Sequence, residues 1–237
     1  MPLTRTIGTH IICSLDNLGE RHDWETFTIT HNPDGSRTAQ TLSRFPGTQV
    51  VRHVTQTVAA DFTPVDGVSR LFIDNVYQGM LVRRVVDGVL TSILFPADGG
   101  PIDLQTIPFD HPDTTLGYHP SSVESWKLMK ISRIIPGPQT MHLLTLSHTW
   151  NGGTLEHAIK LEAQVEYLGE ETITTPAGTF DCHHYVWHTL AFDGDLDIWI
   201  TGEDAVVVRM DGSEKRVRYE LDSYVVKTFD DARELVL

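Results

Sequence analysis

Apolar and polar side chains alternate along most of this chain, and short turn sequences separate the alternating segments. Period two is the spacing at which successive side chains of a β-strand point to opposite faces of a sheet. The turn sequences include Asn-Pro-Asp-Gly at 32–35, Asp-Gly at 87–88 and Thr-Pro-Ala-Gly at 175–178, in which proline presets φ and glycine tolerates a positive φ. The chain is therefore predicted to be mainly β, with antiparallel strands joined by hairpins.

The spacing of the predicted strands favours one continuous sheet. Val50–Ala60 is followed by a meander of three strands, Ser69–Val76, Met80–Val86 and Val89–Phe95, with turns expected at 77–79 and 87–88. A chain of 237 residues is long for one average domain, but all-β sheets and barrels of this size commonly form a single unit. One domain is expected over residues 1–237.

The alternation stops between Pro96 and Pro120, where prolines and glycines accumulate. A long irregular connection of this kind is typical of a lid or binding loop, and a packed structural crossover is the alternative. A helix is predicted from Val123 to about Ile131, with Ser121 or Ser122 as its N-cap. It is the only substantial helix that the sequence predicts.

Composition narrows the class of partner. With 32 acidic and 18 basic residues, the formal net charge of −14 argues against nucleic acid and anionic membranes as partners. The first residues lack the pattern of a secretory signal, no run is long and apolar enough to span a bilayer, and the two cysteines lie far apart in the sequence. A cytoplasmic location is the expectation.

The segment from Tyr167 to Cys182, together with 197–201 and 206–210, carries a resemblance. It resembles an uncharacterised bacterial β-rich domain family in which a Thr-Pro-Ala-Gly-Thr-Phe turn precedes long strands. The fold of that family is thought similar to the half-barrel of lipoprotein-carrier proteins. The resemblance covers the C-terminal part of the chain and implies a single curved antiparallel sheet, a half-barrel or open barrel, partly wrapped around a helix or a ligand.

The strand that leaves the 175–178 turn divides its reactive side chains between two faces. One face carries Asp181, His183, Tyr185 and Trp187, which is the pattern of acid-base chemistry. Here His183 would transfer protons, Asp181 would orient it and Tyr185 would donate to a developing oxyanion, beside an apolar wall. The substrate-binding residues expected on this face are Trp187, Trp199 and Arg209.

The proline-rich segment adds further candidates. His111 or His119 is predicted to supply a second acid-base group on a lid, with Tyr118 beside them as a substrate contact. Arg83 is a candidate for binding a substrate carboxylate through two hydrogen bonds, and at most one of Arg83 and Arg84 can face a pocket.

The opposite face of the same strand offers a metal-binding alternative. Cys182 and His184 lie two residues apart, and a histidine among His53, His142, His148 and His157 would have to complete the site from elsewhere in the sheet. Because no second cluster has matching spacing, no metal is assigned. No nucleotide-binding or nucleophile-elbow motif is present, so no cofactor is assigned either.

These observations lead to two classes of function. The first is a cofactor-independent lyase, dehydratase or isomerase that acts by acid-base catalysis on a small hydrophobic or aromatic molecule held in the concave face of the sheet. The alternative is a non-enzymatic carrier or sensor of a hydrophobic ligand. Long strands also leave edges that a homodimer would cover, so self-association is a further expectation.

Overall fold

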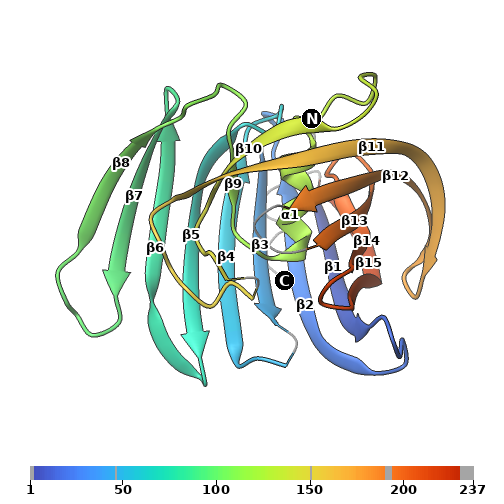
Figure 1. Ribbon diagram of the computed structural model, residues 1–237, viewed down its shortest axis with the longest axis horizontal. Coiled ribbons are helices and arrows are strands. Elements are labelled where there is room, and N and C mark those ends of the chain that lie inside the picture. The colour runs from blue at the N-terminus through green and yellow to red at the C-terminus, as the bar shows by residue number, and fades with distance from the viewer. Residues whose placement is uncertain (1–2, 46, 150, 190–193, 230–237) are drawn as a thin grey trace.

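The computed structural model describes residues 3–45, 47–149, 151–189 and 194–229. In these residues fifteen strands form one sheet, and a single α-helix lies inside its curve (Figure 1). The strands are β1 (Leu3–Ser14), β2 (Arg21–His31), β3 (Arg37–Arg44), β4 (Val50–Val58), β5 (Pro64–Ile73), β6 (Val76–Val86), β7 (Val89–Pro96), β8 (Asp103–Pro108), β9 (Thr115–Gly117), β10 (Gln139–Thr145), β11 (Ile159–Thr175), β12 (Gly178–Thr189), β13 (Gly194–Thr201), β14 (Val206–Gly212) and β15 (Val217–Phe229).

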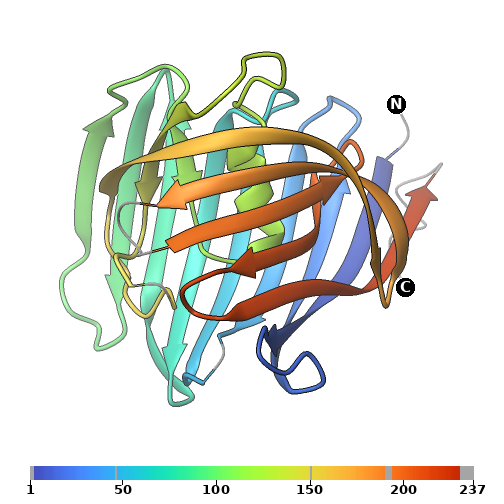
Figure 2. The ribbon, with the colours of Figure 1, turned by 45° about the vertical axis from the view of Figure 1, so that its right-hand side comes forward.

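The sheet is two meanders joined by a central seam. Its order runs from β8 back to β1, crosses to β15, and runs back from there to β9. Neighbouring strands are antiparallel, except that β9 and β10 are parallel. The sheet curves so that β11–β15 cross in front of β2–β6 with the helix between them, and it is open, because β8 and β9 are its two ends (Figure 2). The predicted class, a mainly β chain with one curved sheet and one helix, is confirmed.

The turn at 175–178 forms as predicted. Thr175 pairs with Gly178, and Gly178 has a φ of 139°, which glycine adopts without a steric penalty. The strand before the turn, β11, is continuous from Ile159 to Thr175. A β-bulge at Leu168, followed by Gly169 with a φ of 121°, shifts its register against β12 without breaking it.

The turn between β5 and β6 lies at Asp74 and Asn75, so the prediction of a turn at 77–79 is wrong. Ile73 pairs with Val76, and both turn residues have positive φ values, 53° and 62°. These angles are those of a type I′ turn, whose twist matches that of the flanking strands. Gly79 instead lies within β6 beside a register shift.

Replacing Asn75 with glycine is expected to stabilise the protein by about 0.5 kcal/mol, because glycine reaches positive φ more cheaply than asparagine. The matched control is Gly88→Asn in the turn between β6 and β7, where φ is 72° and a new Cβ would contact nothing within 4 Å. That change is expected to destabilise by a similar amount. Urea unfolding measures both, and a loss of stability in Asn75→Gly would contradict the assignment.

The segment between Pro96 and Pro120 is more ordered than predicted. It contains β8, which extends the sheet beyond β7, and β9, which pairs with β10. β8 gives no alternating signal because it is an edge strand with side chains exposed or half-exposed along its whole length. Two large apolar side chains at this edge, Ile102 and Leu104, are 60% and 59% exposed.

The helix α1 spans Ser121–Leu128, earlier than the predicted Val123 to about Ile131, and every one of its residues is buried. Neither serine is the N-cap, which is Pro120. The N-terminal N–H groups are satisfied from another strand. The Glu25 carboxylate on β2 accepts hydrogen bonds from the N–H groups of Ser121 (2.9 Å) and Ser122 (2.8 Å). A negative charge at this end also complements the helix dipole.

A buried histidine completes this contact. His10 on β1 places Nδ1 3.5 Å from the Glu25 carboxylate and 3.1 Å from the Ser121 hydroxyl, and its Nε2 lies 2.8 Å from the Val207 carbonyl. The Ser121 hydroxyl itself donates to Glu25 at 2.8 Å. The helix is thus fixed to both meanders by one polar cluster in the core.

Candidate functional site

A cavity of about 130 Å³ lies beside α1 under the C-terminal meander. Its walls are mostly apolar, from Phe45, Leu143, Leu161, Trp187, Leu196, Met210 and Val217. Its polar lining inside comes from His119, Glu124, Lys127, Thr145 and Tyr219. At its rim are Asp195 and the β14–β15 turn residues Ser213, Glu214 and Lys215. This combination of apolar walls and a few converging polar groups is typical of small-molecule sites.

Glu124 and Lys127 form an ion pair one helical turn apart on α1. Their side chains are only 12% and 3% exposed. The Lys127 ammonium also lies 4.4 Å from the centre of the Trp187 ring, a cation–π contact that joins α1 to β12. Burial lowers the pKa of Lys127, although Glu124 opposes that shift. The cavity therefore holds a carboxylate and an amine that is easier to deprotonate than an exposed lysine.

His119 lies directly before Pro120, the N-cap of α1, and has a φ of 76°, which is unusual for a residue other than glycine. Its side chain is half-buried in the cavity wall, and its pKa lies well below the usual value because of desolvation, reinforced by the positive charges of Arg52, Lys127 and Arg83. Its Nε2 lies 3.5 Å from the Thr145 hydroxyl. At neutral pH the imidazole is neutral and serves as a hydrogen-bonding group in the cavity.

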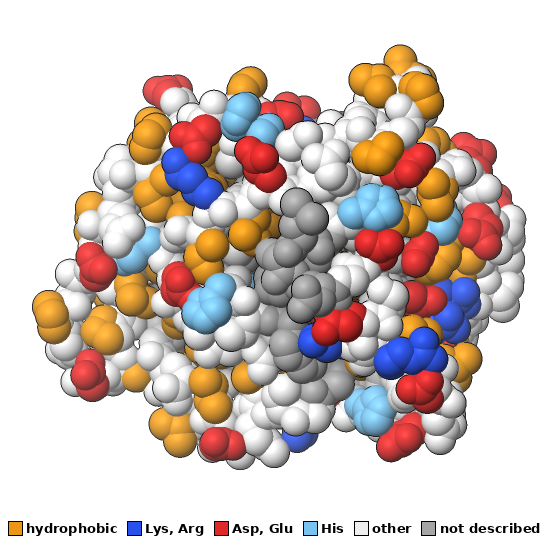
Figure 3. Space-filling model, in the orientation of Figure 1, with side chains coloured by type: hydrophobic (Ala, Val, Ile, Leu, Met, Phe, Trp, Pro, Cys, Tyr) orange, Lys and Arg blue, Asp and Glu red, His pale blue; other side chains and the backbone are white. Residues whose placement is uncertain are grey.

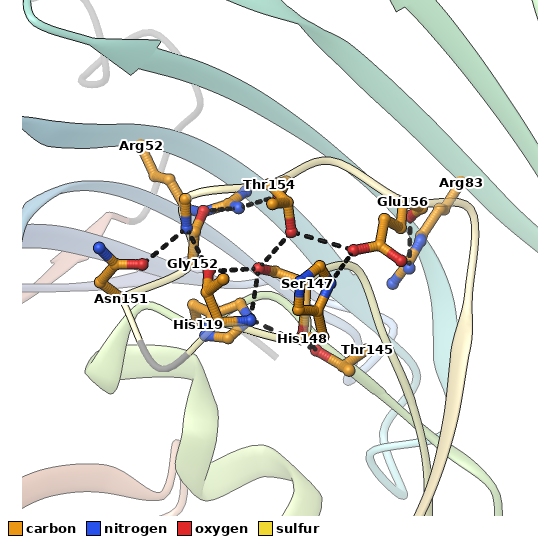
Figure 4. Close-up of polar contacts among 12 residues, drawn as sticks. Arg52, Arg83, His119, Thr145, Ser147, His148, Asn151, Gly152, Thr154 and Glu156 are labelled. Carbon is orange, nitrogen blue, oxygen red and sulfur yellow. Dashed lines mark hydrogen bonds and ion pairs between the residues drawn. The ribbon is translucent and has the colours of Figure 1, made fainter. Parts of the chain in front are cut away.

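Two buried arginines, Arg52 and Arg83, lie in the same polar network as this histidine (Figure 4). Arg52 on β4 donates to the Ser69 hydroxyl at 2.8 Å and to the carbonyls of Gly152 and Thr154. Arg83 on β6 donates to the His157 carbonyl at 2.8 Å. In the described residues neither forms an ion pair, so both charges are balanced only by dipoles. Burial and the neighbouring Arg83 lower the pKa of Arg52 to about 9, so it remains charged at neutral pH.

Tyr219 on β15 contributes a phenol to the cavity. Burial, followed by the charges of Glu25, Glu124 and Asp23, raises its pKa far above the usual value. In the part of the chain that the structure describes, its hydroxyl has no hydrogen-bond partner. The phenol therefore stays protonated and free to donate to a bound molecule.

The structure brings His183 and Tyr185 together, but away from the cavity. Arg133 donates from Nε to the Tyr185 hydroxyl at 2.8 Å and from Nη1 to His183 Nε2 at 2.8 Å. His183 Nδ1 is 3.1 Å from the Tyr167 hydroxyl. Burial and Arg133 lower the pKa of His183. Asp181 does not orient this histidine, because its carboxylate accepts a hydrogen bond from Thr172 instead, at 2.9 Å.

The expectation that Trp199 and Arg209 share a face with His183 is wrong. In the antiparallel register of β12 and β13, Trp199 lies opposite His184, so both point to the other face. The two rings stack 4.3 Å apart. Arg209 on β14 is the cross-strand neighbour of Trp199 and therefore points to the same face, where its guanidinium lies 3.2 Å from the Glu220 carboxylate. A one-residue difference in register decides the face of every side chain in a strand.

Other candidates have structural partners. Tyr118 is buried with Arg83 5.4 Å from its ring centre, and a Cβ at Gly67 would lie 2.4 Å from its hydroxyl. Arg83 points inward, as one of the pair with Arg84 must, but backbone carbonyls occupy its guanidinium. Cys182 is buried, and burial raises the pKa of its thiol to about 11, which disfavours the thiolate that metals require.

Of the predicted site residues, Trp187 and His119 line the cavity, and the other predicted catalytic and substrate-binding residues lie outside it. Sequence reasoning missed Glu124, Lys127 and Tyr219. The one available signal was the i,i+3 spacing of Glu124 and Lys127 on a predicted helix, which is also the spacing of ordinary surface pairs.

The exterior agrees with the acidic composition. On the face shown in Figure 3, acidic side chains and histidines are spread among apolar ones, and basic side chains are sparse. The helix in the described residues is far too short to cross a membrane.

No protein-family model matches the sequence, and no curated protein matches it. Solved structures show the fold. A β-barrel-like protein from Brucella abortus, of a domain of unknown function called DUF1849, superposes with a TM-score of 0.59 at 10% identity, covering 97% of this chain and 98% of that one. A DUF1089 family protein from Pseudomonas aeruginosa gives 0.46 at 11% identity, covering 79% and 88%. The first likeness shows a shared architecture and nothing about activity.

Proposed function

We propose that the protein is a cofactor-independent enzyme, an isomerase, lyase or dehydratase, that performs acid-base chemistry on a small, mainly apolar carbonyl compound in the cavity beside α1. One observation carries the proposal: the Glu124–Lys127 pair, neutral His119 and the Tyr219 phenol converge on an apolar cavity. Acid-base catalysis is the chemistry that the sequence led us to expect. The catalytic groups proposed here are Glu124, His119 and Tyr219 in place of His183, Asp181 and Tyr185. Perturbed pKa values in a cavity are typical of acid-base sites.

The roles follow from charge. Glu124 is the group that would remove a proton from the carbon next to the carbonyl, with the Lys127 ammonium holding the carboxylate in place beforehand. Glu124 would carry that proton until it returns to the substrate. The carbonyl oxygen becomes negative in that step. Neutral His119 and the Tyr219 phenol would donate hydrogen bonds to it, and the positive field that lowers the pKa of His119 would stabilise the oxyanion.

The size of the cavity restricts the substrate. An apolar cavity of roughly 150 Å³ holds a benzene molecule. A volume of about 130 Å³ therefore suits a six-membered ring or a chain of similar bulk. Larger molecules would have to extend past the rim at Asp195 and Lys215.

The experiment is deuterium exchange of the α-hydrogens of cyclohexanone in D₂O, followed by NMR. Exchange is the minimal event shared by reactions that begin by removing such a proton. Glu124→Gln keeps the shape and removes the base, so the protein-dependent exchange rate is expected to fall about 100-fold. Glu203→Gln, at an exposed turn, is the matched control and should exchange at the wild-type rate.

Equal exchange rates in wild type and Glu124→Gln would contradict the catalytic role of Glu124. The carrier hypothesis remains as the second candidate, because most of the cavity wall is apolar. Saturation-transfer NMR on the same samples separates the two proposals. Binding of cyclohexanone without protein-dependent exchange would favour the carrier.

The cytoplasmic location and the homodimer remain predictions. The exposed edge at β8 is where we expect a dimer contact.

A further inference from the structure

Two histidines and a glutamate meet on the outer face of β10 and β11, away from the residues proposed for catalysis. His142 and Glu162 are direct cross-strand neighbours, and His142 Nδ1 lies 3.6 Å from the Glu162 carboxylate. The His111 ring, from the segment before β9, stacks on the His142 ring with centres 3.5 Å apart and planes 7° apart. One ligand atom from each of the three residues lies within 4.8 Å of the others.

The position of His111 is fixed by its neighbours. The carboxylate of the preceding Asp110 accepts a hydrogen bond from Lys160 on β11 at 2.6 Å. Thr114 donates from its hydroxyl to the His111 carbonyl at 2.7 Å, and the hydroxyl of Thr115 donates to the His142 carbonyl at 3.3 Å. The loop is thus attached to both strands on either side of the histidine. This arrangement holds the third side chain over the cross-strand pair before any ligand arrives.

The charges around the cluster suit a cation. Lys160 is already paired with Asp110, and that hydrogen bond is the main reason why the pKa of Asp110 is lowered. Glu162 is then the group that gives the cluster its net negative charge. Imidazole and carboxylate are ligands that Zn²⁺ accepts together.

We propose that His111, His142 and Glu162 form a binding site for Zn²⁺ with three protein ligands. Zinc at a bond length of 2.0–2.1 Å places tetrahedral ligand atoms roughly 3.3 Å apart. In this structure the three ligand atoms lie within 4.8 Å of one another, and His111 is an exposed side chain whose ring can rotate to bring its nitrogen closer to the other two. Three protein ligands leave one coordination position for water.

The test uses the full chain prepared without a histidine tag. Isothermal titration calorimetry with ZnCl₂ should show one saturable site. His142→Ala and His111→Ala should each weaken Zn²⁺ binding by at least about 100-fold. His148→Ala is the matched control, because His148 also contacts a single glutamate, Glu156, on an exposed surface, but has no third ligand beside it. It should bind Zn²⁺ as wild type does.

Co²⁺ absorption tests which side chains bind the metal. Wild type should give the visible spectrum of tetrahedral nitrogen and oxygen ligation, without a thiolate band, and His142→Ala should lose it. Wild-type affinity in both histidine variants would overturn the proposal, as would the absence of a saturable site or a thiolate band. Circular dichroism checks that the exposed-site variants remain folded.

Discussion

Replacing Glu25 with alanine is expected to lower the free energy of unfolding by about 3–5 kcal/mol. The Glu25 carboxylate is 1% exposed and accepts hydrogen bonds from two helix N–H groups and one hydroxyl. Without it, the N–H groups of Ser121 and Ser122 are buried without a partner, and the Ser121 hydroxyl beside His10 loses its acceptor. Hydrogen bonds to a charged group contribute more than neutral ones.

Urea unfolding followed by circular dichroism measures this loss. Glu25→Gln should destabilise the protein less than Glu25→Ala, because the amide oxygen of glutamine still accepts hydrogen bonds from the helix N-terminus. Some loss should remain, because the NH₂ group of glutamine would face another hydrogen-bond donor. Glu20→Ala is the control at an exposed position at the end of the β1–β2 connection and should change stability by less than about 0.5 kcal/mol. A loss below about 1 kcal/mol in Glu25→Ala would show that the cluster is not what anchors the helix.

Replacing Lys127 with methionine is expected to destabilise the protein by about 3–5 kcal/mol, although methionine is close to lysine in length and more apolar. The reason is the partner left behind, since Glu124 would remain as an unpaired carboxylate in the core. Removing both charges in Lys127→Met with Glu124→Gln should recover most of the loss. Urea unfolding of the wild type, the single variant and the double variant measures both changes.

Lys130→Met is the matched control for this prediction. Lys130 follows the same helix but is a fifth exposed, and contacts Asp61, which is 68% exposed. Exposed pairs contribute roughly 0–1 kcal/mol, so this variant should be nearly neutral. If Lys127→Met were as mild as Lys130→Met, the Glu124–Lys127 pair would be solvated in solution and the cavity would not be a low-dielectric site.

The fold was largely predictable because its hairpins are locally encoded. The turns at 87–88 and 175–178 carry glycine where the backbone needs positive φ, and the alternation around them assigns the faces. The turn at Asp74 and Asn75 was missed because neither residue is glycine and Gly79 lies nearby. β8 was missed because an exposed edge strand has no buried face to produce a pattern.

The site was less predictable, for reasons of long-range geometry. The prediction placed four side chains of β12 on one face, and they do share it: Asp181, His183, Tyr185 and Trp187. Only Trp187 lines the cavity, because β12 extends beyond the cavity wall. Trp199 was misplaced because the register of β13 depends on a connection whose length the turn sequence does not specify. Glu124 and Lys127 resemble a surface pair until a second meander, distant in sequence, covers them.

The seam between β1 and β15 has a consequence for synthesis of the chain on the ribosome. Each meander pairs neighbours in sequence, so its hairpins can form soon after they emerge. Leu3, however, pairs with Phe229, so β1 and β15 at the middle of the sheet cannot pair until nearly the whole chain has been synthesised. Until β15 emerges, β1 presents an unpaired strand edge to the cell. We therefore expect nascent chains that stop before residue 217 to be clients of chaperones, and release of that protection to coincide with closure of the seam.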